Sequence, residues 1–203
     1  MAVEAELPRF GLAHTVFHYA RLVPSSRTTA VDASFWHGLR DASAAALDSM
    51  THVPLDSAVL ACTSAGFIKG PPLPPATITA FDVLLSALTA IDASRVVLAT
   101  PYPDPVTRAE SAALSDAGFD VLAYGSLGLN DGYADISLTQ IRTLLRELSP
   151  EAVRAADAVV LSCTGWHTLP VVRTLEQEMR KPVISSNLAI AMHAARLSAG
   201  VIL

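Results

Sequence analysis

Hydrophobic and polar positions divide the chain into short apolar runs and longer stretches with helical spacing. The apolar runs have the length of strands, and apolar residues occupy most of their positions, including neighbouring ones. They cover residues 15–23, 58–62, 95–99, 119–124, 158–162 and 183–185. Strands that are apolar on both faces belong to parallel sheets covered by helices on either side. The pattern therefore predicts an α/β fold with parallel sheet.

Helices are predicted between these runs, because apolar side chains recur there every three or four residues. Phe81, Leu84 and Leu88 show this spacing in one stretch, and Asp32 can cap the start of another. Gly118 marks the end of a third helix. The predicted helices cover residues 32–50, 77–91, 105–117, 138–148, 151–156, 168–179 and 188–198.

One motif occurs twice, half the chain length apart. Residues 56–63 read Asp-Ser-Ala-Val-Leu-Ala-Cys-Thr, and residues 157–164 read Asp-Ala-Val-Val-Leu-Ser-Cys-Thr. We infer two pseudo-symmetric Rossmann-like lobes, each a mainly parallel sheet flanked by helices, with the active site in the cleft between them. The first lobe would cover residues 1–92, completed by the C-terminal helix 188–203, and the second residues 93–187.

Each copy of the motif ends a strand at Cys-Thr. Ligands of open α/β sheets bind at the carboxyl ends of the strands, and free N–H groups at helix starts favour anions and lower a thiol pKa. Cys62 and Cys163 would then face each other across the cleft. One thiolate could attack or remove a proton on one face of a carbon beside a carboxylate, while the other thiol delivers a proton on the opposite face. Such a pair should include at least one thiol of low pKa.

Composition and charge narrow the classes of partner. The formal net charge is −5 and lysine occurs only at Lys69 and Lys181, which argues against a nucleic-acid footprint. The chain is 51% hydrophobic, yet no apolar run approaches the roughly 18 residues of a membrane span. The N-terminal residues lack the cationic start of a secretory signal, so we expect a cytoplasmic protein with reduced cysteines. The low fraction of charged residues, 16%, favours a homo-oligomer, a dimer or tetramer.

Neither a metal nor an organic cofactor is expected from the sequence. His14 and His18 have the spacing of two metal ligands on a helix, but no third ligand accompanies them. The glycines between residues 125 and 132 do not form a dinucleotide or phosphate-binding motif. The expected partner is a small carboxylate substrate.

Five short motifs in order resemble those of the maleate cis–trans isomerases, members of the aspartate/glutamate racemase superfamily to which the arylmalonate decarboxylases are related. The motifs lie at residues 23–26, 61–64, 99–102, 161–164 and 184–187. The resemblance implies a two-lobed fold with its site between the lobes and no cofactor. It also implies that Cys62 is the nucleophile, that Cys163 is its acid partner, and that Tyr102 binds a substrate carboxylate.

Several positions differ from the isomerase pattern. Arg27 stands where the isomerases carry an asparagine, Gly132 replaces a second asparagine, and Gly165 follows the second Cys-Thr. Arg27 could bind a carboxylate through both guanidinium nitrogens. We therefore expect a substrate other than maleate. The candidate substrate-binding residues are Ser26, Arg27, Thr63, Ser64, Tyr102, Thr164 and Gly165.

Three functions remain open from the sequence. The first is a cofactor-independent isomerase or racemase that acts on a small carboxylate through both cysteines. The second is a decarboxylase of a malonate-type acid, in which Cys163 alone donates the proton. The third is a catalytically degenerate protein of this fold that binds a carboxylate without changing it.

Overall fold

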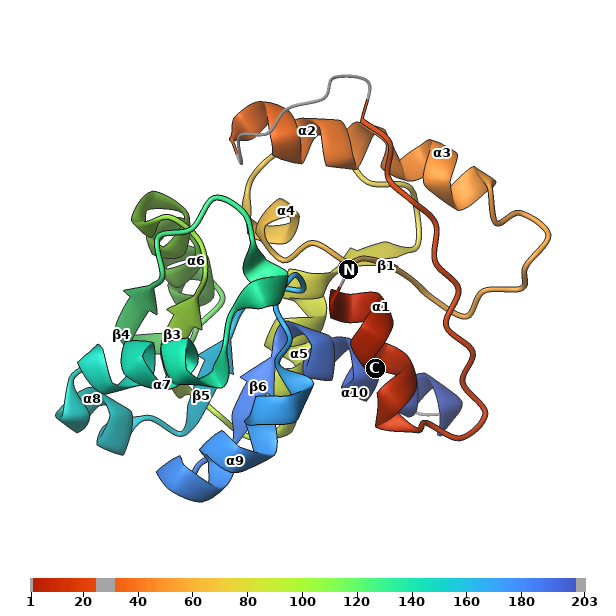
Figure 1. Ribbon diagram of the computed structural model, residues 1–203. Helices are drawn as coiled ribbons and strands as arrows, with labels where there is room; N and C mark the ends of the chain where they lie inside the picture. Colours follow the sequence, from red (N-terminus) through yellow and green to blue (C-terminus); the bar gives the residue numbers. More distant parts are fainter. Residues whose placement is uncertain (1, 25–31, 200–203) are drawn as a thin grey trace.

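Two parallel sheets form the framework of the computed structural model, which describes residues 2–24 and 32–199 (Figure 1). The smaller sheet pairs β1 (Ala58–Leu60) with β2 (Thr77–Thr79). The larger sheet has the order β4-β3-β5-β6, from strands Asp120–Ser126, Arg95–Thr100, Ala158–Leu161 and Val183–Ser185. Every pairing in both sheets is parallel. The predicted α/β fold with parallel sheets is confirmed.

The helices connect the strands and cover the sheets. Their bounds are α1 (Ala2–Glu6), α2 (Ala33–Asp41), α3 (Ser43–Asp48), α4 (Ser64–Phe67), α5 (Ala80–Ala90), α6 (Asp104–Asp116), α7 (Leu138–Glu147), α8 (Pro150–Ala155), α9 (Leu169–Met179) and α10 (Ser186–Ser198), with 3-10 turns η1 (Leu7–Phe10) and η2 (Tyr133–Asp135). Capping boxes at Thr79 and Ser137 define the first turns of α5 and α7. Among the described residues, no helix is both long and apolar enough to span a membrane.

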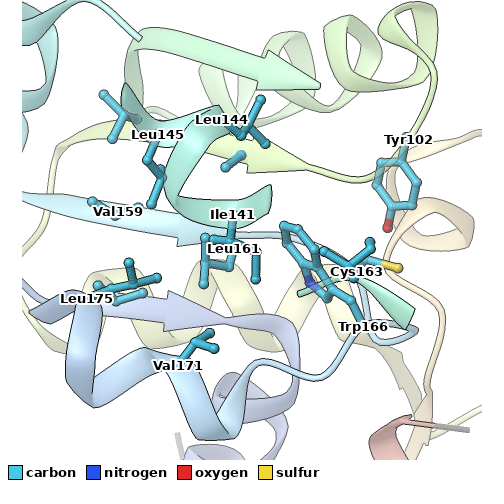
Figure 2. Close-up of a cluster of buried hydrophobic side chains, with 14 of the residues drawn as sticks. Tyr102, Ile141, Leu144, Leu145, Val159, Leu161, Cys163, Trp166, Val171 and Leu175 are labelled. Atoms are coloured by element: carbon cyan, nitrogen blue, oxygen red, sulfur yellow. The ribbon is translucent and has the colours of Figure 1, made fainter. Parts of the chain in front are cut away.

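The central strands of the larger sheet, β3 and β5, are mostly apolar because each face is buried against a different set of helices. Val97 and Val159 belong to a core on the α7 and α9 side, which contains Ile141 and Trp166 (Figure 2). Their neighbours in the chain, such as Val96, belong to a second core with side chains of α5 and α10. Successive side chains in a strand point to opposite faces, so both must be apolar here.

The first half of the chain differs from the prediction at several points. Residues 15–23 form no strand; they run extended along the edge of the molecule towards α2, and Val16 and Val23 are each 77% exposed (Figure 1). The predicted helix over residues 32–50 is interrupted at Ala42, which separates α2 from α3. Residues 77–79 form β2 rather than the start of a helix. The helix α1 was not predicted.

The two predicted lobes therefore contain sheets of unequal size. The part of the first lobe that the structure describes has a two-stranded sheet, and the second lobe has a four-stranded sheet. Helix α10 packs against α5, in the arrangement expected if the C-terminal helix completes the first lobe. The exact domain boundaries remain a prediction.

Candidate active site

The two cysteines line one cavity of about 480 Å³. Cys62 lies between β1 and α4, and Cys163 directly follows Ser162 at the end of β5. Both are free thiols. The same cavity is lined by five other predicted site residues: Thr63, Ser64, Tyr102, Thr164 and Gly165. Ser26 and Arg27, also predicted to bind substrate, lie outside the described residues.

Cys62 is surrounded by hydrogen-bond donors at the start of α4. Its sulfur lies 3.5 Å from Ser64 Oγ and accepts hydrogen bonds from the backbone N–H groups of Ser64 and Ala65. These donors favour a thiolate, but burial has the larger effect and raises the pKa of Cys62 above its ordinary value. The expectation of a lowered thiol pKa is wrong here, because the sulfur loses more hydration than the donors replace.

Cys163 is a buried thiol on a strained backbone. Its φ of +152° lies in a region that favours glycine, and its N–H donates to Ser186 Oγ at 3.1 Å. The sulfur accepts from Gly165 N at 3.2 Å and from the hydroxyl of Tyr102, which lies beside it in Figure 2. Burial nevertheless raises the pKa of Cys163 to about 12. This thiol is thus protonated at neutral pH and suited to donate a proton.

Hydrogen bonds connect the two strand ends that carry the cysteines. Thr164 Oγ1 donates to the carbonyl of Ala61 at 2.8 Å. Thr63 Oγ1 donates to Ser186 Oγ at 2.9 Å, the same oxygen that accepts from Cys163 N. The threonine hydroxyls therefore hold the two halves of the site together. Their predicted contact with a substrate carboxylate remains untested.

Tyr133 is a cavity residue that the sequence prediction missed. Its ring packs edge-on against Tyr102, with centroids 5.9 Å apart, and its hydroxyl donates to the carbonyl of Leu129 at 3.2 Å. Burial, with the negative charge that the two cysteines can carry, raises the pKa of Tyr133. The tyrosine lies in a segment predicted only as a loop, and no motif distinguishes it from other loop residues.

Gly165 lies where two cavity side chains leave little room for a side chain. A Cβ atom at this position would lie 3.1 Å from Cδ2 of Tyr133 and 3.3 Å from the sulfur of Cys163. The sequence prediction also missed a contact of Ser64. Its Oγ accepts a 2.8 Å hydrogen bond from Trp36 Nε1, which holds the serine side chain in place. Small and hydrogen-bonded residues thus set the space around both thiols.

Away from the cysteines the cavity is mostly apolar. It extends beneath α2 and α3, where its lining includes Leu22, Phe35, Leu39, Leu47 and Met50. Glu4 and Arg21 also line it and form an ion pair with each other at 2.7 Å. Within the described ranges, no group of three or more histidine, cysteine or acidic side chains could hold a metal ion.

Comparisons with known proteins agree with this geometry. The family model described as arylmalonate decarboxylase matches residues 64–200, more than half of the chain. The arylmalonate decarboxylase of Bordetella bronchiseptica is 33% identical over 125 residues, which are 60% of this chain and 51% of that protein. A maleate isomerase of Nocardia farcinica is 34% identical over 116 residues, 56% of this chain and 45% of that protein. The matched segment thus spans about half the length of these curated relatives.

Solved structures share the fold over more of the chain. A mutant of the Nocardia farcinica maleate cis-trans isomerase with a covalently bound succinylcysteine intermediate aligns with a TM-score of 0.86 and 23% identity, over 98% of this chain and 88% of that one. A glycine-to-cysteine mutant of arylmalonate decarboxylase in the sulfate ion associated form aligns with a TM-score of 0.69 and 24% identity, over 86% and 80% of the two chains. At these identities the likeness concerns the fold.

Proposed function

Because this chain belongs to the arylmalonate decarboxylase family, we propose that it is a cofactor-independent isomerase or racemase acting at a carbon beside a carboxylate. Cys62 and Cys163 are its two reacting groups. One observation carries the proposal: each half of the chain delivers a cysteine from the end of a parallel strand, and both thiols line the same cavity.

The two thiols have different surroundings, which assign them different roles. At Cys62 the donors from Ser64 and Ala65 oppose the rise in pKa caused by burial, and they favour the thiolate, the form that removes a proton or adds to a double bond. Cys163 holds its proton at neutral pH and supplies it. Cys62 is therefore the base or nucleophile, and Cys163 is the acid.

Racemisation by this pair balances without a further reactant. The Cys62 thiolate takes the proton from the carbon beside the carboxylate, and the electron pair of that C–H bond moves into the carboxylate to give an enediolate. Cys163 then donates its proton to the opposite face of the carbon. The configuration is inverted, Cys62 ends as a thiol and Cys163 as a thiolate.

Isomerisation of an alkene uses the same groups. Addition of the Cys62 thiolate to one alkene carbon forms a C–S bond, and the other carbon receives the proton of Cys163. The former double bond can then rotate. Return of the proton to Cys163 and departure of Cys62 restore the double bond in the other geometry.

The cavity favours a substrate with an apolar substituent. Side chains such as Phe35, Leu47 and Met50 line the part beneath α2 and α3, and an apolar group placed there loses contact with water. Tyr102 stands beside Cys163, and its hydroxyl, which donates its one proton to the sulfur, could donate it to a substrate carboxylate instead. Arg27 and Ser26 remain further candidates for that carboxylate.

Decarboxylation is the second candidate, favoured by the family model and by the apolar cavity. Here a malonate-type acid loses carbon dioxide, the electrons of the broken C–C bond form an enediolate, and Cys163 protonates it on one face. Cys62 has no part in this reaction. Loss of activity in a Cys62 variant would therefore indicate an isomerase or racemase, and retained activity would indicate a decarboxylase.

The test is incubation of aryl- and alkyl-substituted carboxylic, malonic and unsaturated acids in D2O, monitored by proton NMR. For a racemase or isomerase, Cys62→Ser and Cys163→Ser each lower turnover by about a thousandfold or more, the scale of losing a reacting group. For a decarboxylase, Cys62→Ser retains carbon dioxide release and Cys163→Ser abolishes it. Full turnover in Cys163→Ser would refute both. Binding of an acid without turnover or deuterium exchange would favour the degenerate protein.

A further inference from the structure

A carboxyl group is buried beside the chain segment that carries Cys163. Glu110, on α6, has no solvent exposure. Its Oε1 accepts a short hydrogen bond from the hydroxyl of Ser162, the residue that precedes Cys163 in the chain. Its Oε2 is buried and has no hydrogen-bond partner. The proposed mechanism does not use this carboxyl.

The position of Glu110 follows from how α6 is held against the strand ends. The helix begins two residues after Tyr102, and Thr107 on its inner face shares a 2.6 Å hydrogen bond with Thr100 at the end of β3. Glu110 is three residues further along the helix and so shares that face. The carboxyl therefore lies where the chain segments carrying Tyr102 and Cys163 leave the sheet.

A charge on Glu110 would act on both of these cavity groups. Burial raises the pKa of Glu110 to about 8, and the hydrogen bond from Ser162 opposes the shift. When ionised, its carboxylate raises the pKa of Cys163 and of Tyr102, because each would have to become an anion beside a buried anion.

The other titratable groups around α6 lie on the solvent side or belong to the cavity. On α6 itself, Asp104 and Arg108 form an exposed ion pair, and Asp116 is exposed. On β4, Asp120 and Tyr124 are exposed. Helix α4 carries no titratable side chain. Cys62 lies just before this helix, and a negative charge on it would raise the pKa of Cys163 and of Tyr102.

We propose that Glu110 is a positioning residue for Cys163, which supports the reaction while uncharged and suppresses it in alkaline solution through its negative charge. The proposal rests on the proposed function, in which Cys163 donates a proton. Each of the reactions above builds negative charge in the cavity as an enediolate or a thiolate. A carboxylate charge in the same poorly solvated region opposes that charge.

The first test is the pH dependence of kcat/KM in the wild type, in Glu110→Gln and in the exposed control Asp116→Asn. Glutamine keeps the shape of glutamate and an oxygen for the Ser162 hydroxyl. From pH 7 to pH 9 the kcat/KM of the wild type divided by that of Glu110→Gln should fall about tenfold, as expected for one group that ionises near pH 8 in the wild type alone. This ratio cancels the ionisation of Cys62, which both proteins share. Asp116→Asn should follow the wild type. Superimposable profiles of wild type and Glu110→Gln would overturn the proposal.

The second test needs no substrate. In a Cys62→Ser background Cys163 is the only cysteine of the chain, since the sequence contains two. The rate of alkylation by iodoacetamide is followed from pH 7 to pH 11. Adding Glu110→Gln should raise the rate at pH 10 by about tenfold, which corresponds to one pKa unit for Cys163. An unchanged rate would contradict the proposal, whether or not an acid is turned over.

The two failures are thus distinguishable. A shifted alkylation profile without turnover of any acid would retain the link between Glu110 and Cys163 and reject the proposed function. If Glu110→Gln does not fold, Ser162→Ala supplies the same information. Loss of the Ser162 hydrogen bond should raise the pKa of Glu110 and move the alkaline loss of activity to higher pH. An unmoved alkaline limb would overturn the proposal.

Discussion

Ser186→Ala removes one oxygen on which both halves of the site depend. Ser186 Oγ accepts from the backbone N–H of Cys163 at 3.1 Å and from Thr63 Oγ1 at 2.9 Å. All three residues are buried: Ser186, Cys163 and Thr63. Alanine keeps the helix position at the start of α10 and removes only the acceptor.

The expected cost follows from the two donors that lose their partner. A buried donor left without an acceptor costs about 1–3 kcal/mol, so the loss of an acceptor for two donors should lower the free energy of unfolding of Ser186→Ala by about 2–6 kcal/mol. The site should be affected as well. The hydrogen bond from Cys163 N–H to Ser186 Oγ helps to hold Cys163 at its φ of +152°. This conformation costs about 1–3 kcal/mol in a residue other than glycine. Once released, this backbone can relax and move the thiol, so turnover should fall.

Urea unfolding followed by circular dichroism measures the first effect. Ser115→Ala is the matched control, because Ser115 is exposed on α6 and its hydroxyl bonds only to the helix carbonyl of Ser111. It should change stability by less than about 0.5 kcal/mol. A loss below about 1 kcal/mol in Ser186→Ala would mean that the two donors find other partners. The reasoning about the shared acceptor would then be refuted.

Three further changes have expected outcomes. Glu6→Ala should destabilise the protein by about 3 kcal/mol or more. The buried carboxyl group of Glu6 accepts hydrogen bonds from Leu169 N at 2.8 Å and from Asn187 Nδ2 at 2.7 Å, and both donors would lose their partner. Thermal unfolding measures this loss, with Glu147→Ala at an exposed position as the control. Gly165→Ala should keep the fold by circular dichroism and lower kcat/KM by about tenfold or more, because the new methyl group displaces the reacting thiol. Glu110 should make stability fall as the pH rises from about 5 to 8: its folded pKa of about 8 exceeds the ordinary 4.5, so the folded state binds the proton more tightly and loses that advantage as the pH rises. The free energies of unfolding of wild type and Glu110→Gln, measured as a function of pH, should diverge over this range. Parallel curves would contradict this role of Glu110.

The sequence alone determined the parallel sheet and the pair of cysteines. The runs at residues 96–99 and 158–161 are apolar at every position, and only a strand covered on both faces needs such a pattern. The repeated strand with Cys-Thr at its end placed Cys62 and Cys163 at equivalent points. Because ligands of open α/β sheets bind at the carboxyl ends of the strands, and the repeat suggested two lobes facing each other, this local pattern was enough to predict that both thiols line one cavity.

The strand predicted over residues 15–23 shows where local pattern fails. Its residues suit a strand, but a strand also needs a neighbouring backbone to pair with, and the described structure provides none for it. Conversely, residues 77–79 read as part of a helix and became β2, because the backbone of β1 is available beside them.

Only the tertiary structure decided the chemistry of the individual groups. The N–H donors at Cys62 could be expected from the chain, whereas the burial that outweighs them depends on segments distant in sequence. The same holds for Tyr133, which lies in a segment predicted as a loop and packs on Tyr102, and for Glu110, whose buried carboxyl bonds to Ser162. A residue's type follows from the sequence, but its pKa depends on the water and charges around it, and these are set by how distant segments pack together.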